Sequence, residues 1–485
     1  MPDPTIASGP RPAGVLPSFF PAFRRPAAGF VLAVAVAASA LSALPAAVTA
    51  QSQSVQRPFG TLRDQARTQQ QWLELRLERV LPRLMREHGI EMWIIPTREY
   101  NEDPIFFSMA GPTTMAARRR TIYVFHDHGP EEGVERIAIG GTSQGGLFDV
   151  VRAPQPADGP AGTEERRAEP FGPEQWQLLT PIVEDRDPAT IAVNISRVHN
   201  YADGLTAGEW EQLQEALGPT YLDRVVRSEL LPIQYIEERL PEMLGIYRRM
   251  QAVVHDLIGI AFSNHVITPG ETTTDDVVWW LRQSARDIGL TVWFQPSVSV
   301  QRQGVAMNDS TSPVIRRGDV LHTDFGITLF RLNTDTQHMG YVLREGETAP
   351  PQGLLDALAV GNRLQNIVLE ELVPDRTGNE VLRAARSRME EAGIDGTIYS
   401  HPVGDHGHGA GPLIGLWDRQ EGVPGRGDVP IRPNTWFSIE LQATTPVPEW
   451  DGQPVRMALE EEALIDSAGE RRWMLRRQEA LHLVH

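Results

Sequence analysis

Three acidic residues in the second half of the chain follow strand-like runs of largely apolar residues. Asp324 ends the run Val-Leu-His-Thr-Asp, Glu440 follows Phe-Ser-Ile, and Glu460 follows Met-Ala-Leu. A carboxylate at the end of a buried strand costs free energy unless it is paired or bound to a cation. The chain must therefore adopt a fold that gives these acids partners.

The side chains that the sequence lacks narrow the chemistry. There is no cysteine, which excludes disulfide frameworks, thiolate metal sites and thiol nucleophiles. There is no lysine either, so all 45 basic residues are arginines, and Schiff-base and P-loop chemistry are excluded. Any metal site must use oxygen and nitrogen ligands. The net charge of -18 disfavours nucleic acid or an anionic membrane surface as a partner.

Residues 1–50 have the pattern of a signal peptide. Arg24 and Arg25 precede an uncharged run rich in Ala, Val and Leu, which ends in the small-residue sequence Ala-Val-Thr-Ala. We expect cleavage after about Ala50 and export to the periplasm or the medium, by the Sec or the twin-Arg route. A retained membrane anchor is the weaker alternative, because the run is only weakly hydrophobic and contains Pro45.

The remaining chain divides into a unit at 51–231 and a unit at 232–485. In the first, an amphipathic pattern predicts a helix over 61–88 with a kink at Pro82, and four apolar runs predict strands. The segment 153–175 is rich in Pro, Gly and charge, which predicts a surface insertion. The predicted strands are Met92–Ile95, Thr121–Phe125, Arg136–Ile139 and Thr190–Val193, and a further helix is predicted near Glu209–Leu217.

The second unit combines helices with strands. Apolar residues at helical spacing predict a long helix over 243–257, and Thr273 with Asp276 is a capping signature for a helix that ends at Asp287. Further helices are predicted at 354–371 and 378–391, with strands from Thr291 onward. The fold class is therefore α+β.

The polar residues of the second unit occur in a distinctive order. Asp335 follows Asp324 by eleven residues, and two strands joined by a tight turn can bring both carboxylates to one point. His408 then lies in the sequence Gly-His-Gly-Ala-Gly, and Glu440 and Glu460 follow. Such geometry suits a metal site.

This order resembles the five metal ligands of the pita-bread metallopeptidases, a group that includes methionine aminopeptidases, prolidases, Xaa-Pro aminopeptidases and the metal-free creatinases. The resemblance covers about residues 232–485. The preceding unit resembles the smaller α/β N-terminal domain of the creatinase, prolidase and Xaa-Pro aminopeptidase branch. The resemblance implies a C-terminal pita-bread fold after a creatinase-like domain. It is also compatible with a homodimer.

The resemblance also implies roles. Asp324 would chelate one metal, His408 and Glu440 would hold a second, and Asp335 and Glu460 would bridge them, with Glu440 as proton shuttle. Four carboxylates and an imidazole suit two divalent ions, Mn²⁺ above all, or Co²⁺, Zn²⁺ or Fe²⁺. A hydroxide held between two such ions can attack a scissile carbonyl. The predicted function is therefore an exported peptidase of aminopeptidase or Xaa-Pro prolidase type, with a peptide substrate.

Two substrate-contacting histidines of the family are missing. The segment 303–309 contains no His, and position 415 is Gly where a second His is expected. Asn308 could replace the first, and His401 or His406 the second, as catalytic residues. The alternative function is a metal-binding pseudoenzyme or a peptide-binding module. A creatinase-like amidinohydrolase is disfavoured, because creatinases lack the ligands that this chain keeps.

Several weaker signals have ordinary explanations. Glu460, Glu461 and Glu462 alternate faces in a strand, and at least one is expected in solvent. Ser143 lies in a Gly-x-Ser-x-Gly pattern, but prolines downstream leave no room for the helix of a nucleophile elbow, so a turn is expected. His126 and His128 have no evident third ligand, and His338 is expected to be a hydrogen-bonded strand residue.

Overall fold

The computed structural model describes residues 57–152, 174–305 and 313–485. The predicted signal peptide, Asn308 and nearly all of the predicted insertion lie outside the described residues. Residues 55–485 form one compact unit, so the division at 231 stays a prediction. Within the described ranges, none of the helices combines the length and the apolar character needed to cross a membrane.

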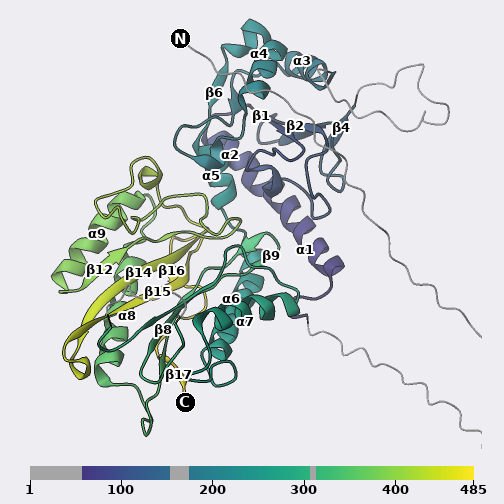
Figure 1. Ribbon diagram of the computed structural model, residues 1–485. Coiled ribbons are helices and arrows are strands. Elements are labelled where there is room, and N and C mark those ends of the chain that lie inside the picture. Colours follow the sequence, from purple (N-terminus) through teal and green to yellow (C-terminus); the bar gives the residue numbers. More distant parts are fainter. Residues whose placement is uncertain (1–56, 153–173, 306–312) are drawn as a thin grey trace, which may run out of the picture. The chain divides into compact units, whose positions relative to one another are not determined.

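The first part of the chain builds a mixed sheet of six strands in the order β4-β3-β2-β1-β5-β6 (Figure 1). β1, β2 and β3 are antiparallel neighbours, and β5 and β6 run parallel to β1. The four strands predicted here are confirmed as β1, β2, β3 and β5. The bounds are β1 Met92–Arg98, β2 Arg120–Asp127, β3 Val134–Ile139, β4 Asp149–Val151, β5 Ile191–Val193 and β6 Val225–Arg227.

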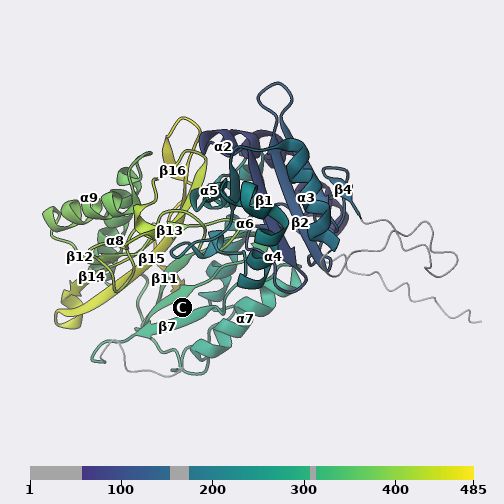
Figure 2. The ribbon, with the colours of Figure 1, turned by 90° about the horizontal axis from the view of Figure 1, so that it is seen from above.

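Helices cover both faces of this sheet (Figure 2). In β1, Met92 and Ile94 pack with α3 and α4, whereas Trp93 and Ile95 pack with α1 and α2, as strand alternation requires. The bounds are α1 Leu62–Leu75, α2 Leu81–Glu87, α3 Glu174–Arg186 and α4 Ala207–Leu222. α3 begins inside the predicted insertion, and its Gln175 is buried, so the prediction of a surface segment is wrong at that end.

The predicted kink at Pro82 takes a different form. A single π-helical turn, Arg76–Val80, joins α1 to α2 immediately before Pro82. Proline lacks the N–H that would bond the carbonyl four residues back, and a wider turn just before it accommodates that loss.

The second part builds a sheet of nine strands whose main path is β12-β14-β15-β11-β8-β7. β13, β16 and β17 pair at the sides of β14, β15 and β11. A separate hairpin of β9 and β10 connects β8 to β11. The bounds are β7 Ser297–Gln301, β8 Val320–Asp324, β9 Thr328–Leu329, β10 Leu332–Asn333, β11 Gln337–Val342, β12 Asp395–Ile398, β13 His401–Pro402, β14 Thr435–Val447, β15 Gln453–Ile465, β16 Arg471–Trp473 and β17 His482–Val484.

The helices of this part follow the sequence signals closely. Thr273 caps α7 with a reciprocal bond to Asp276, as predicted, and Thr377 caps α9 in the same way. The apolar faces of α8 and α9 pack on β14 and β15. The bounds are α5 Leu230–Glu237, α6 Leu244–Ala261, α7 Thr274–Asp287, α8 Gln352–Glu371 and α9 Gly378–Glu391.

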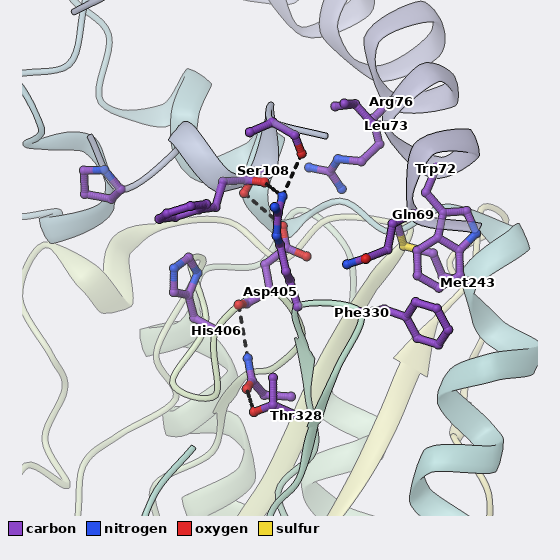
Figure 3. Close-up of a pocket in the computed structure, with 15 residues that line it drawn as sticks. Gln69, Trp72, Leu73, Arg76, Ser108, Met243, Thr328, Phe330, Asp405 and His406 are labelled. Carbon is purple, nitrogen blue, oxygen red and sulfur yellow. Dashed lines mark hydrogen bonds between the residues drawn. The ribbon is translucent and has the colours of Figure 1, made fainter. Parts of the chain in front are cut away.

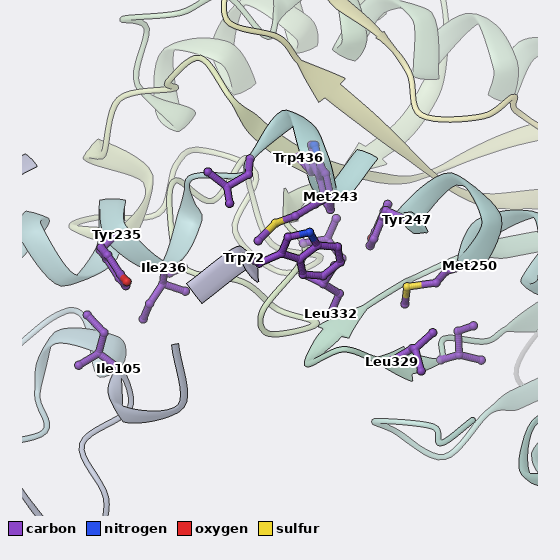
Figure 4. Packing of buried hydrophobic residues seen from close by; sticks show 14 of the residues in the cluster. Trp72, Ile105, Tyr235, Ile236, Met243, Tyr247, Met250, Leu329, Leu332 and Trp436 are labelled. Atoms are coloured by element: carbon purple, nitrogen blue, oxygen red, sulfur yellow. The ribbon is translucent and has the colours of Figure 1, made fainter. Parts of the chain in front are cut away.

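One buried apolar cluster continues from the helices of the first sheet into the second part of the chain. Trp72 of α1, Tyr247 of α6 and Trp436 of β14 all belong to it (Figure 4). The rings of Tyr247 and Trp436 lie 4.2 Å apart between centroids. This packing holds α6 against the sheet that carries the predicted ligands.

Candidate metal centre

Four polar residues lie in one row across four neighbouring strands. Strand pairing aligns Asp324 of β8 with Gln337 of β11, and Gln337 with Glu460 of β15. Glu460 is in turn aligned with Glu440 of β14. Side chains in register project from the same face of a sheet, so three carboxylates and an amide are brought together.

Asp335 and two histidines complete this group. Ligand atoms of Asp324, Asp335 and Glu460 lie within 4.8 Å of one another, and so do those of His401, Glu440 and Glu460. Asp335, His401 and His408 form a third such set. The structure thus gathers all five residues predicted as ligands, together with His401. Their role in metal binding stays a prediction.

His401 lies at the centre of the carboxylates. Its Nε2 is 3.3 Å from Glu460 and 3.7 Å from both Asp335 and Glu440. Its Nδ1 is 2.9 Å from the carbonyl oxygen of Pro402, which can only accept, so Nδ1 carries the proton. In the neutral ring Nε2 then presents a lone pair to the carboxylates. This is the tautomer that binds a metal.

The cluster leaves buried polar atoms without partners. Asp324 Oδ1, Asp335 Oδ1 and His401 Nε2 are buried, and no hydrogen bond reaches them. Burial, together with the charge of Glu460, raises the pKa of Asp324, Asp335 and Glu440 well above the usual range. Divalent cations would satisfy these atoms and the charge together, so the residues present fit a metal centre.

The other two histidines of this loop differ from His401. His408 is exposed, and its ring lies 4.9 Å from that of His401. Partial desolvation of its ring and the neighbouring His401 lower the pKa of His408 to about 4, so it is neutral at pH 7. His406 instead packs its ring on Tyr201, 4.4 Å between centroids, and belongs to none of the clusters among the described residues.

The structure explains why position 415 carries no imidazole. Gly415 has φ +77°, and a Cβ atom built there would lie 2.3 Å from the carbonyl oxygen of Ile398. Any side chain at this position would therefore strain the backbone and clash. His408 is the imidazole that remains exposed beside the cluster.

Gln337 is a site residue that the sequence reasoning missed. Its amide donates to Glu460 over 2.8 Å and to Glu440. The signal was available, because Gln337 follows Asp335 by two residues and a strand places such residues on one face.

The three consecutive glutamates are all buried, so the prediction that at least one would be in solvent is wrong. Glu460, Glu461 and Glu462 are at most 1% exposed. Glu462 accepts from the backbone N–H of Asp335 over 2.8 Å. Glu461 contacts His255 and His338, whose imidazoles lower its pKa to about 2 although burial alone would raise it. His338 is the hydrogen-bonded strand residue predicted.

The weaker motifs are also placed. Ser143 lies in a turn, with three backbone N–H groups directed at its carbonyl oxygen, which confirms the turn interpretation. His126 and His128 do gain a third neighbour, Glu135, which the sequence did not show. Arg186 already holds both oxygens of Glu135, at 2.5 and 2.7 Å, so an ion pair accounts for this carboxylate.

A pocket of about 350 Å³ is lined by residues near two of the candidate ligands in sequence (Figure 3). None of the candidate ligands lines it. Its wall includes Asn333, two residues before Asp335, and His406, two residues before His408. Trp72, Arg76 and Ser108 from the first part of the chain also line it. The volume is within the range of small-ligand pockets.

Comparison with known proteins identifies the fold. Residues 246–467 match the model of metallopeptidase family M24. No curated protein matches the chain by sequence. The match confirms the predicted resemblance, and with the solved structures below it confirms a pita-bread domain preceded by a smaller α/β domain.

Three solved peptidase structures share this fold. The X-Pro aminopeptidase from Thermotoga maritima is 18% identical, with a TM-score of 0.57, over 83% of this chain and 100% of that one. The Xaa-Pro dipeptidase from Bacillus anthracis is 16% identical, with a TM-score of 0.51, over 86% and 99%. The prolidase from Pyrococcus furiosus is 15% identical, with a TM-score of 0.51, over 82% and 100%.

The same fold also occurs in a protein whose name does not describe a peptidase. The N-terminal domain of the FACT complex subunit SPT16 from Cicer arietinum is 10% identical, with a TM-score of 0.51, over 87% of this chain and 99% of that one. Function must therefore be argued from the site.

Proposed function

We propose that this chain, whose residues 246–467 match the model of metallopeptidase family M24, is an exported peptidase that uses two divalent ions to cleave short peptides, with Xaa-Pro peptides as the favoured class. The observation that carries the proposal is a cluster of four carboxylates, three of which lie within 3.7 Å of His401 Nε2, together with three buried polar atoms that make no hydrogen bond. The proposal of export rests on the sequence of residues 1–50. The Xaa-Pro preference rests on the peptidases that share the fold.

Each proposed ion has its own ligands. Asp324 would hold one ion, His401 and Glu440 the other, and Asp335 and Glu460 would be shared. The sequence predicted His408 as the histidine ligand. We assign this role to His401 instead, because its Nε2 lies among the carboxylates and its Nδ1 carries the proton. Mn²⁺ is the first candidate because the donor set is rich in hard oxygen atoms, followed by Co²⁺, Zn²⁺ and Fe²⁺. When bound, the ions would acidify a water molecule and polarise the scissile carbonyl.

The remaining roles belong to the chain's own side chains. Glu440 accepts a proton on a carboxylate oxygen and passes it to the leaving amine, and Gln337 orients Glu440 through its amide. His408, neutral and exposed beside His401, donates to the substrate carbonyl oxygen. The pocket of about 350 Å³ leaves space for a short peptide.

Metal uptake and hydrolysis of Ala-Pro and Met-Ala peptides, each with and without Mn²⁺, test the proposal. Wild-type protein should bind the ion and cleave, and Asp335→Ala should lose both properties. Asp256→Ala, an exposed acid on α6, is the matched control and should keep both. A wild-type protein that binds no divalent ion would overturn the proposal.

A second pair of variants separates the two histidines. His401→Ala should lose metal as well as activity. His408→Ala should keep its metal and lose kcat by about 100-fold, the usual effect of removing one such donor. The reverse pattern would restore His408 as the ligand.

Gly415 favours one alternative, a metal-binding or peptide-binding module without turnover. The backbone there excludes the second family imidazole. Bound metal and bound peptide without cleavage of any member of a broad peptide panel would support this alternative.

A further inference from the structure

A second group of ionisable side chains is buried on the opposite face of the same strands. His338 follows Gln337 in β11 and Glu461 follows Glu460 in β15, so alternation turns both away from the proposed ion pair. His255 of α6 meets them there. These three residues offer ligand atoms that lie within 4.8 Å of one another.

The three side chains are buried and directed at one another. His255, His338 and Glu461 are 6%, 3% and 1% exposed. Glu461 turns one oxygen to each imidazole: Oε1 is 2.7 Å from Nε2 of His338, and Oε2 is 3.0 Å from Nε2 of His255. The two imidazole centroids are 4.7 Å apart. The carboxylate of Glu461 and the two imidazoles can therefore offer two nitrogen and two oxygen atoms as ligands to one metal ion.

A fourth side chain orients this set from behind. Nε2 of His482, in β17, lies 3.0 Å from Nδ1 of His338. A histidine that binds a metal through one nitrogen commonly donates its other N–H to a fixed acceptor. With the proton of His338 on Nδ1, it donates to His482 and leaves the lone pair of Nε2 directed at Glu461.

We propose that His255, His338 and bidentate Glu461 form a third, structural metal site that binds Zn²⁺. Imidazole nitrogen with carboxylate oxygen is a donor set that zinc prefers, and a closed, buried position is typical of structural rather than catalytic zinc. The ion would place a divalent charge beside the buried carboxylate of Glu461, whose oxygens otherwise have the two imidazoles as partners. It would also join α6, β11 and β15, which are far apart in the sequence, directly behind the proposed catalytic ligands.

The experiment separates this site from the proposed catalytic one. Protein is loaded with Zn²⁺ and exchanged into metal-free buffer, and zinc is counted per chain by mass spectrometry. The double variant Asp335→Ala/Glu440→Ala should lose the two catalytic ions and retain one. His255→Asn/His338→Asn should retain two and lose one. His265→Asn, an exposed histidine, should match the wild type.

X-ray absorption of the zinc retained by Asp335→Ala/Glu440→Ala gives a readout that does not depend on the folding of the histidine variant. The first shell should contain two imidazole nitrogens and carboxylate oxygens. A folded Asp335→Ala/Glu440→Ala protein without zinc would overturn the third site and leave the peptidase proposal intact. If Asp335→Ala/Glu440→Ala retained as much zinc as the wild type while His255→Asn/His338→Asn lost one ion, only the proposed catalytic site would be contradicted.

Discussion

The hydroxyl of Tyr201 donates a hydrogen bond to the backbone carbonyl of His408. Tyr201 belongs to the first part of the chain, so this bond ties that part to the loop that carries His408, beside the candidate metal ligands. The ring of Tyr201 also packs on His406. The position of His408 therefore depends on a residue about two hundred positions earlier.

Removing this hydroxyl should impair turnover without removing metal. Tyr201→Phe is expected to lower kcat/KM for an Ala-Pro peptide about fivefold, since a single hydrogen bond contributes about 1 kcal/mol. Metal content should stay at the wild-type level. Tyr221→Phe is the control, because its hydroxyl contacts only the exposed Asp187 among the described residues. Equal kinetics in both variants would show that the bond does not position His408.

The metal-free protein should gain stability when one acid of the centre is neutralised. Glu460 lies within 4.8 Å of the carboxylates of Asp324, Asp335 and Glu440, so Glu460→Gln removes repulsion and should raise the free energy of unfolding in EDTA by about 1–3 kcal/mol. In saturating Mn²⁺ the wild type should instead have the higher free energy of unfolding of the two proteins. Denaturant unfolding in both buffers measures this, with the exposed Glu470→Gln as control. A destabilised variant in EDTA would contradict the prediction.

Glu237 should make stability fall as the pH rises. Both of its oxygens are buried without partners, and burial raises its pKa to about 8. Between the unfolded pKa of about 4.3 and this value the folded chain holds an additional proton, so the contribution is present at low pH and is lost through pH 8.

Glu237→Gln removes this dependence. Relative to the variant, the wild type should lose up to about 4 kcal/mol between pH 5 and pH 9. Denaturant unfolding at three pH values measures the difference, from which titrations shared by both proteins cancel. Parallel curves would show that Glu237 does not titrate in this range.

Arg331 should stabilise the join between the two parts of the chain. It lies in the turn between β9 and β10 and donates to the carbonyl oxygens of Phe107, Ala110, Gly111 and Thr114. An ammonium group cannot reproduce this fork, so Arg331→Lys should cost about 1–3 kcal/mol by denaturant unfolding. The exposed Arg419→Lys should cost nothing measurable. Equal denaturant midpoints for the wild type and Arg331→Lys would show that Arg331 does not stabilise this join.

Elements with local signals could be predicted from the sequence. α7 begins at its predicted cap, and α9 covers 378–391 as predicted, because capping and helical periodicity are encoded within a few residues. α3 has no such signal. Pro181 interrupts its pattern, and it follows a segment rich in Pro and Gly, so tertiary packing on the first sheet decides its fold.

The candidate site was predictable only in part. The order of the acids indicated which side chains converge. Which histidine they meet depends on the pairing of His401 with Ser438, two residues from Glu440, and loop spacing does not encode that pairing. The set around Glu461 was hidden for the same reason, because its members come from four elements spread over more than two hundred residues.

The three consecutive glutamates of β15 do not by themselves fix the register of β15 against β14, so the residues on either side of them must do so. A slip of one residue against β14 would still present a carboxylate to each face, since positions 460–462 are identical. The apolar residues of β15 on both sides of the trio, among them Leu459 and Ala463, would then change faces and meet the wrong surroundings. Correct assembly at this charged part of the core is therefore set by the apolar residues that flank the trio, and polar substitutions at Leu459 or Ala463 should disturb both clusters at once.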